Sequence, residues 1–121
     1  MSTQIPPTLR GIRNFISVAD LDAPILKALL TFAIERKQVA QAGRLQPALQ
    51  GKALAMLFQK PSLRTRLSFE RATAQLGGQP INLEDHQVGL GKREAVEDVA
   101  RVISSMCDGI MARVYQHSFI E

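Results

Sequence analysis

The sequence contains little cysteine, few aromatic residues and no long apolar run. Cys107 is the only cysteine among 121 residues, so an internal disulfide and a cysteine-rich metal cluster are excluded, and a reducing, cytoplasmic compartment is expected. No apolar run approaches the roughly 20 residues that cross a bilayer, so the sequence predicts no membrane-spanning segment. Tryptophan is absent and Tyr115 is the only tyrosine, which argues against an aromatic platform for stacking nucleic-acid bases.

Length and charge narrow the class of protein without selecting a partner. The composition, 45% hydrophobic and 21% charged, is typical of globular proteins, and 121 residues fit one domain. Fifteen Lys and Arg residues against eleven Asp and Glu residues give a net charge of +4. This charge suits anionic ligands, but the chain lacks the concentrated basic stripe of nucleic-acid binders.

Helical and strand patterns alternate along the chain. Asp20 or Asp22 can cap a first helix with Pro24 in its first turn, and apolar spacing continues that helix to about Lys37. The elements expected next are an apolar strand at 53–58, a helix at 64–76 closed by two glycines, a short strand at 81–83, a polar loop at 86–93, an amphipathic helix at 96–106 and an apolar strand at 110–114. Alternating strands and helices predict an α/β fold with a parallel sheet and flanking helices.

The turn at 61–66 has the features of an anion-binding site. It joins the end of the predicted strand 53–58 to a helix start, where unpaired backbone N–H groups point beyond the carboxyl edge of the sheet. Ser62 and Thr65 offer hydroxyl groups, and Arg64 offers a planar guanidinium suited to phosphate oxygens. A simpler alternative is that Ser62 only caps the helix and the arginines are solvated. The glycines of the Walker and dinucleotide-binding motifs are absent, so nucleotide binding is not supported.

Four further residues carry groups that can take part in chemistry. Arg113 lies near the end of the predicted strand 110–114 and is expected at the same sheet edge as the turn 61–66. His86 and His117 lack a nucleophile or carboxylate partner in the sequence pattern, so we assign them no catalytic role. Cys107 ends an apolar helix face and is expected to be a buried, inert thiol.

The segment from Phe58 to Glu70 resembles the carbamoyl-phosphate signature of the aspartate and ornithine carbamoyltransferases, and its Ser-x-Arg-Thr-Arg core is highly specific. The similarity spans roughly Asn14 to Glu121 and includes the segments Gln75 to Gly78, Glu94 to Arg101 and Asp108 to Arg113. Two segments, Gln87 to Gly89 and Arg113 to His117, are most similar to ornithine carbamoyltransferase. The segment Leu90 to Lys92 is also similar to the aspartate enzyme.

The resemblance implies an ornithine carbamoyltransferase. Such an enzyme transfers the carbamoyl group of carbamoyl phosphate to the side-chain amine of ornithine and yields citrulline and phosphate. The alternatives are the aspartate enzyme and a non-catalytic phosphate-binding or interaction module. The resemblance implies no metal or organic cofactor, no membrane or nucleic-acid partner, a cytoplasmic homotrimer or multiple of trimers, and a role in arginine biosynthesis.

The resemblance also implies which residues act. Those expected to bind carbamoyl phosphate are Ser62, Leu63, Arg64, Thr65, Gln87 and Arg113. Of these, Arg64, Thr65 and Arg113 are expected to be catalytic, because they stabilise negative charge on the phosphate and on the carbonyl oxygen. Gln87 is expected to reach the site of a neighbouring subunit, with Lys92 as a weaker candidate for the same task.

The resemblance gives a domain assignment as well. Residues 1–13 are expected to be a flexible tail, because Pro6 and Pro7 break any helix there. Residues 14–121 are expected to be a partial carbamoyl-phosphate-binding domain, without the second, amino-acid-binding domain of the family. The chain by itself is therefore expected to be inactive.

Overall fold

The computed structural model describes residues 5–92 and 94–121. The chain divides into two compact units, residues 1–46 and residues 47–121, and each is described by itself. Part of the expected tail, residues 1–4, and Arg93 of the expected loop lie outside the described residues. The domain boundary after residue 13 stays a prediction.

The first unit is built around helix α1, Ala23–Gln41. Asp22 caps this helix, as predicted: its Oδ1 accepts a hydrogen bond from the backbone N–H of Ile25 at 3.0 Å. The helix runs past the predicted end near Lys37, because Val39 is buried and continues the apolar face. Two short 3-10 helices precede it, η1 at Pro7–Leu9 and η2 at Val18–Asp20.

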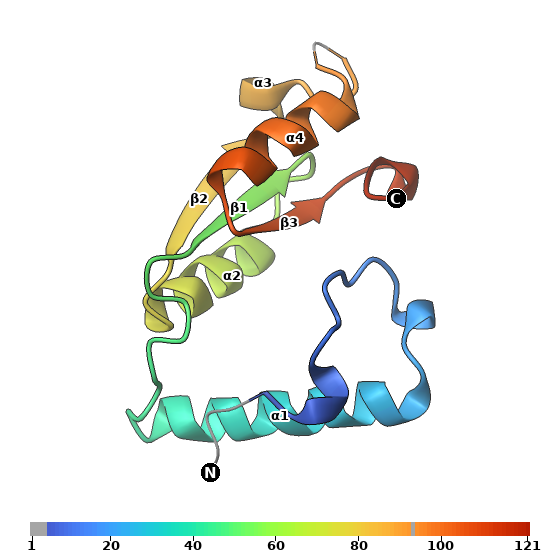
Figure 1. The fold of residues 1–121 in the computed structure, drawn as a ribbon. Coiled ribbons are helices and arrows are strands. Elements are labelled where there is room, and N and C mark those ends of the chain that lie inside the picture. The colour runs from blue at the N-terminus through green and yellow to red at the C-terminus, as the bar shows by residue number, and fades with distance from the viewer. Residues whose placement is uncertain (1–4, 93) are drawn as a thin grey trace. The chain divides into compact units, whose positions relative to one another are not determined.

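The second unit is a three-stranded sheet with helices beside it (Figure 1). Its elements in chain order are β1 Ala53–Phe58, α2 Leu63–Gln75, β2 Gln79–Glu84, α3 Asp85–Val88, α4 Val96–Met106, β3 Gly109–Arg113 and η3 His117–Phe119. The strand order is β2-β1-β3, and β1 pairs in parallel with both neighbours. This confirms the predicted α/β class with a parallel sheet and flanking helices.

The central strand β1 is buried on both faces of the sheet, as predicted. Its side chains alternate between the faces, and Ala55 and Leu57 belong to a core cluster with residues of α4. By the same alternation, Met56 and Phe58 project from the opposite face. Helix α2 lies on that side of the sheet (Figure 1). All four side chains are buried, so the strand is held in place by packing on both sides.

Strand β2 and helix α4 each differ in one detail from the sequence prediction. Strand β2 begins at Gln79 and includes Pro80, whereas the pattern predicts a strand only from residue 81. Proline is tolerated there because β2 is an edge strand, whose outer N–H groups need no partner strand. Met106, placed by its spacing on the apolar face of α4, is 77% exposed because it is the last residue of the helix.

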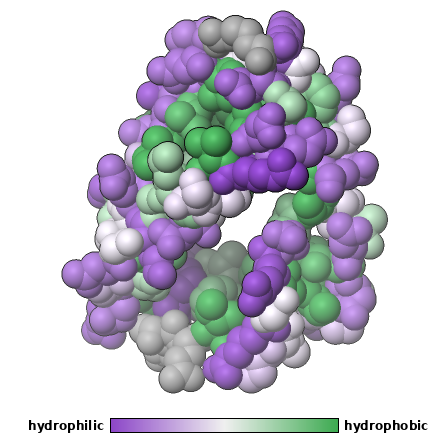
Figure 2. All heavy atoms as spheres, turned by 45° about the horizontal axis from the view of Figure 1, so that its top comes forward, coloured by the Kyte–Doolittle hydropathy of each residue, from purple (hydrophilic) through white to green (hydrophobic). Residues whose placement is uncertain are grey.

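Apolar side chains remain exposed among the polar ones, and Figure 2 shows them as patches on the surface. Examples are Leu63 and Leu67 of α2 and Val102 of α4. Within residues 5–92 and 94–121 the buried apolar residues are correspondingly few: Leu9, Val39, Ala55, Met56, Leu57, Phe58, Leu90, Val99 and Ile103. Because so few side chains form the core, the loss of any one of them is expected to lower stability measurably.

Candidate functional site

The candidate site begins where β1 turns into α2. Ser62 occupies the N-cap position of α2 with an extended backbone, and its carbonyl accepts a hydrogen bond from the N–H of Arg66 at 3.0 Å. Its hydroxyl, however, accepts no capping hydrogen bond from the helix. The first-turn N–H groups are therefore not taken up by this side chain, and they carry the partial positive charge of a helix start. The structure thus argues against the alternative in which Ser62 serves only as a helix cap.

Three residues at the carboxyl edge of the sheet lie side by side in one row. Phe58, the last residue of β1, is in register with Glu84 of β2 on one side and with Arg113 of β3 on the other. Parallel strands bring their carboxyl ends to the same edge, which is where ligands bind in open α/β sheets. The row therefore places an acidic side chain, Glu84, on one side of β1 and a basic side chain, Arg113, on the other.

Arg113 reaches the first turn of α2. Its Nη1 lies 3.4 Å from the Oγ1 of Thr65, to which it donates a hydrogen bond. Gln59 supports this arrangement, because its N–H donates to the carbonyl of Arg113 and its Oε1 accepts from the N–H of Tyr115, both at 2.9 Å. The structure therefore brings together the turn 61–66 and Arg113, as the sequence led us to expect. Sequence reasoning missed Gln59, although its place directly after a strand end was a usable signal.

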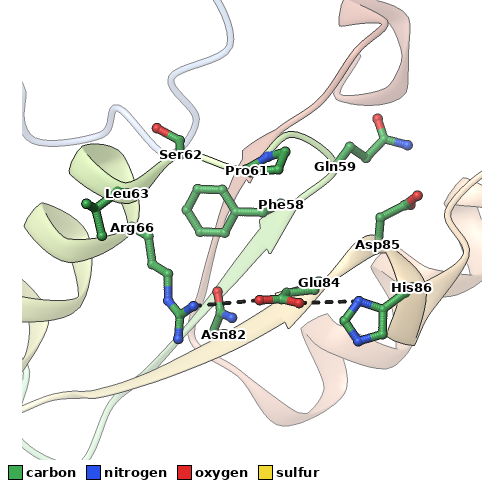
Figure 3. A pocket seen from close by; sticks show the side chains of 10 residues that line it. All are labelled: Phe58, Gln59, Pro61, Ser62, Leu63, Arg66, Asn82, Glu84, Asp85 and His86. Atoms are coloured by element: carbon green, nitrogen blue, oxygen red, sulfur yellow. Dashed lines mark ion pairs between the residues drawn. The ribbon is translucent and has the colours of Figure 1, made fainter.

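A pocket of about 320 Å³ opens beside this turn. Figure 3 shows Ser62, Leu63 and Arg66 on the α2 side and Glu84, Asp85 and His86 at the end of β2 and in α3. The volume is at the lower end of the range for small-molecule pockets. Acidic residues lie on one wall and a helix start on the other, and apolar side chains such as Phe58, Pro61 and Leu63 line the space between them. Sequence reasoning missed the acidic wall, because it depends on how α3 follows β2.

The cations near the turn differ in their surroundings. Arg66 is held by two acids: its Nε lies 3.6 Å from Oε2 of Glu70, and its Nη1 lies 3.6 Å from Oε1 of Glu84. The Nζ of Lys60 lies 5.2 Å from the centre of the Tyr115 ring, a cation–π contact. Arg64 is exposed and makes no ion pair with any residue that the structure describes. Its guanidinium is therefore available to an anion.

The segment with Gln87 and Lys92 is more ordered than the sequence suggested. The pattern predicted a polar loop at 86–93, but one helical turn, α3, opens it and ends at Gly89, whose backbone is left-handed with φ +66°. The side chain of Gln87 accepts a hydrogen bond from the N–H of Glu84 at 2.9 Å, so it is engaged within its own chain. Lys92 is exposed. The structure does not bring Gln87 or Lys92 to the first turn of α2 in the same chain.

The two histidines and the cysteine belong to elements other than the turn 61–66. The Nδ1 of His86 lies 3.3 Å from Oε2 of Glu84, and His86 lines the pocket. The Nε2 of His117 lies 3.6 Å from Oε1 of Glu121. Cys107 is half-buried at the end of α4 and packs against the core cluster, so it is less deeply buried than predicted.

Neither a metal-binding cluster nor a membrane-spanning helix is present among the described residues. No group of three or more His, Cys, Asp and Glu side chains in this part of the chain could hold a metal ion. No helix among the same residues is long and apolar enough to cross a membrane.

Comparison with models of protein families shows which family the chain belongs to. The family described as aspartate/ornithine carbamoyltransferase, carbamoyl-P binding domain, matches residues 13–121. The chain belongs to this family. The match covers all of the second unit and most of the first, and it confirms the resemblance that the signature at 58–70 suggested.

Individual carbamoyltransferases are similar in sequence and in structure. An ornithine carbamoyltransferase of Staphylothermus marinus is 46% identical over 94% of this chain and 36% of its own length. The structure of ornithine carbamoyltransferase from Pyrococcus furiosus superposes with a TM-score of 0.85 at 42% identity, covering 89% of this chain and 34% of that one. The catalytic subunit of M. Jannaschii aspartate transcarbamoylase superposes with a TM-score of 0.77 at 35% identity, over 87% of this chain and 35% of that one. The chain thus spans about a third of the length of these relatives.

Proposed function

We propose that this chain is the carbamoyl-phosphate-binding part of an ornithine carbamoyltransferase. The reaction joins the side-chain nitrogen of ornithine to the carbonyl carbon of carbamoyl phosphate. The bond from that carbon to the phosphate oxygen breaks, phosphate leaves with the electron pair, and the nitrogen loses a proton to give citrulline. The similarity to proteins named ornithine carbamoyltransferase, at 42% to 46% identity for two of them, supports ornithine over aspartate as the acceptor.

The observation that carries this proposal is the contact between Arg113 and Thr65 above the sheet edge. It places a guanidinium and a hydroxyl together beside the start of a 13-residue helix. In the reaction, negative charge grows on the carbonyl oxygen and on the departing phosphate. Fixed positive groups and N–H donors at that position stabilise such charge more than water does, because they need no reorganisation.

We assign roles to the residues of the site on this basis. The first-turn N–H groups, with Ser62 and Leu63, bind the phosphate oxygens. Arg64 pairs with the phosphate through its planar guanidinium, since no acid within the described residues competes for it. Thr65 and Arg113 stabilise the carbonyl oxygen. No step of this mechanism calls for a metal or an organic cofactor.

The assembly is part of the same proposal and rests on the resemblance. Gln87 and, as a weaker candidate, Lys92 would act at the site of a neighbouring subunit in a homotrimer or a multiple of trimers. Neither residue lies at the first turn of α2 in its own chain, which is compatible with a role in a second copy. A cytoplasmic location and a function in arginine biosynthesis complete the proposal.

The proposal is tested by titrating the ¹⁵N-labelled chain with carbamoyl phosphate and, separately, with inorganic phosphate. We expect the amide signals of Leu63, Arg64 and Thr65 to shift, with a dissociation constant of about a millimolar, because only a few charge-assisted hydrogen bonds offset the cost of association. We also expect no citrulline from the chain alone with ornithine. Unchanged amide signals at the helix start would contradict the proposed site. Micromolar binding, or citrulline formation, would show that the chain is more complete than we propose.

Replacing Arg64 by Ala provides the matched variant for this titration. The affinity is expected to fall about thirtyfold, or about 2 kcal/mol, because a charge-assisted hydrogen bond is lost. Arg71→Ala is the control, because Arg71 is an exposed arginine further along the same helix. If Arg64→Ala and Arg71→Ala bind the anion with equal affinity, Arg64 is a solvated side chain and does not bind the anion.

A further inference from the structure

Two consecutive residues in the first turn of α2 reach opposite outer strands of the sheet. Thr65 accepts a hydrogen bond from Arg113 at the end of β3, at 3.4 Å. Arg66 forms an ion pair with Glu84 at the end of β2, at 3.6 Å. Glu84 and Arg113 are both in register with Phe58. The start of α2 is therefore tied to the sheet on both sides at the same level.

The carboxylate of Glu84 has contacts on both of its oxygens. Oε1 faces the guanidinium of Arg66, and Oε2 lies 3.3 Å from the Nδ1 of His86 (Figure 3). The backbone N–H of Glu84 donates to the side chain of Gln87. Glu84 thus links the end of β2, the turn α3 and the start of α2, although its side chain is nearly half exposed, at 45%.

Arg66 is directed away from the helix start by these acids. Its guanidinium lies between Glu84 and Glu70, within 3.6 Å of an oxygen of each. Figure 3 shows the side chain extending from α2 toward Glu84 and Asn82 of β2, whereas Ser62 lies at the other end of the pocket. The positive charge of Arg66 is therefore used to hold α2 to β2 and is not presented to an anion at the first turn.

We propose that Glu84 is a positioning residue for the anion site: through Arg66 it fixes the start of α2 over the sheet edge, on the side opposite to Arg113. This inference rests on the proposed function, because the anion site is its object. It goes further by giving a role to an acid that does not touch the anion. Without Glu84, the first turn loses its ion pair with the end of β2 and keeps the hydrogen bond to Arg113, and its N–H groups are less well aimed.

The direction in which Glu84→Gln changes the affinity for phosphate distinguishes a positioning role from a purely electrostatic effect. Glu84→Gln removes a negative charge near a site for an anion, so electrostatic repulsion alone predicts tighter binding of phosphate. Positioning predicts weaker binding. We expect the affinity for inorganic phosphate, followed by the amide signals of residues 63–65, to fall about two- to fivefold, the size expected for an exposed ion pair. Glu97→Gln, on α4, makes the same change of charge away from the site and controls for net charge.

A charge exchange provides the second variant. Arg66→Glu alone should weaken phosphate binding, and the double variant Arg66→Glu/Glu84→Arg should restore it to within about twofold of the original chain, because the ion pair is rebuilt in reverse. If the double variant stays as weak as Arg66→Glu, Arg66 itself binds the anion and the inference is wrong. The amide spectrum of α4 and β3 reports whether each variant keeps its fold.

The outcomes distinguish this inference from the proposed function. If the original chain shows no phosphate-dependent shifts at residues 63–65, the anion site fails and the inference fails with it. If the original chain binds phosphate but Glu84→Gln binds it equally or more tightly, only the positioning role is overturned. Weaker binding by Glu84→Gln together with restoration by the charge exchange supports both.

Discussion

The Nη1 atom of Arg113 lies 3.4 Å from the Oγ1 atom of Thr65, a residue 48 positions earlier in the chain. The contact exists because β1 and β3 are adjacent and parallel, so the residue that ends β3 lies beside the strand that leads into α2. The candidate site therefore depends on the order of the strands in the sheet as well as on the local motif at residues 61–66.

Removing the charge of Arg113 should weaken anion binding without unfolding the chain. Arg113→Gln is expected to lower the affinity for phosphate at least about tenfold, since a hydrogen bond to a charged group contributes about 1.5 kcal/mol or more. Arg113 is exposed, so the amide spectrum elsewhere should persist. The measurement is the same ¹⁵N titration, with Arg101→Gln as a control because the Arg101 side chain is 79% exposed on α4. Loss of affinity in both variants alike would indicate only a non-specific charge effect.

Stability of the second unit should depend on the face of α4 that meets the sheet. Ile103 is 8% exposed and belongs to the core cluster, whereas Val102, its neighbour in the helix, is 57% exposed. Ile103→Ala should lower the free energy of unfolding by about 2 to 4 kcal/mol, and Val102→Ala by less than about 0.5 kcal/mol. Urea unfolding followed by circular dichroism measures both. Similar values for the two variants would show that α4 does not pack as described.

Asp108 should stabilise the start of the sheet through a hydrogen bond to the backbone. Its Oδ2 accepts from the N–H of Ala53 at 2.9 Å, and its own N–H donates to the carbonyl of Ala53 at the same distance. Asp108→Ala should therefore cost about 1 to 2 kcal/mol in the free energy of unfolding. Lys52→Ala is the control: it removes only the exposed ion pair at 3.8 Å, which is expected to contribute less than about 1 kcal/mol. A larger effect for Lys52→Ala than for Asp108→Ala would reverse this assignment.

Gly77 should resist substitution for two reasons at once. Its φ is +83°, and an added Cβ would lie 3.1 Å from the Cβ of Pro47. Gly51 has a similar φ of +77° but no atom within 4 Å of such a Cβ. Thermal unfolding of both alanine variants should show destabilisation by about 1 kcal/mol from the backbone alone, with a further loss only for Gly77→Ala. Equal losses would show that the contact with Pro47 relaxes freely.

Much of the second unit could be predicted because the patterns are strong. The unbroken apolar run 53–58, bounded by Lys52 and Gln59, predicted a strand that is buried on both faces. The spacing of apolar residues at 96–106 fixed the helix that became α4. The turn 61–66 and Arg113 could be placed at one sheet edge because parallel strands share that edge.

The features that escaped prediction depend on register and on single side chains. The helical turn α3 was read as loop because Gly89 and Gly91 dominate its pattern, whereas the hydrogen bond from Glu84 to the Gln87 side chain helps to set the turn. The Arg66–Glu84 pair requires that β2 end level with β1, which periodicity does not specify. Spacing along α2 points only to the partner of Arg66 within its own helix, Glu70.

Residues within the sheet are constrained by folding, whereas residues at its carboxyl edge are constrained by what the chain binds. Ala55, Met56 and Leu57 are enclosed within the sheet, and substitutions there are penalised through folding whatever the chain binds. The outer strands end in Glu84 and Arg113, which lie at the carboxyl edge of the sheet and outside this core. New preferences for small anions can therefore arise by exchanging rim residues, while the scaffold beneath is inherited unchanged.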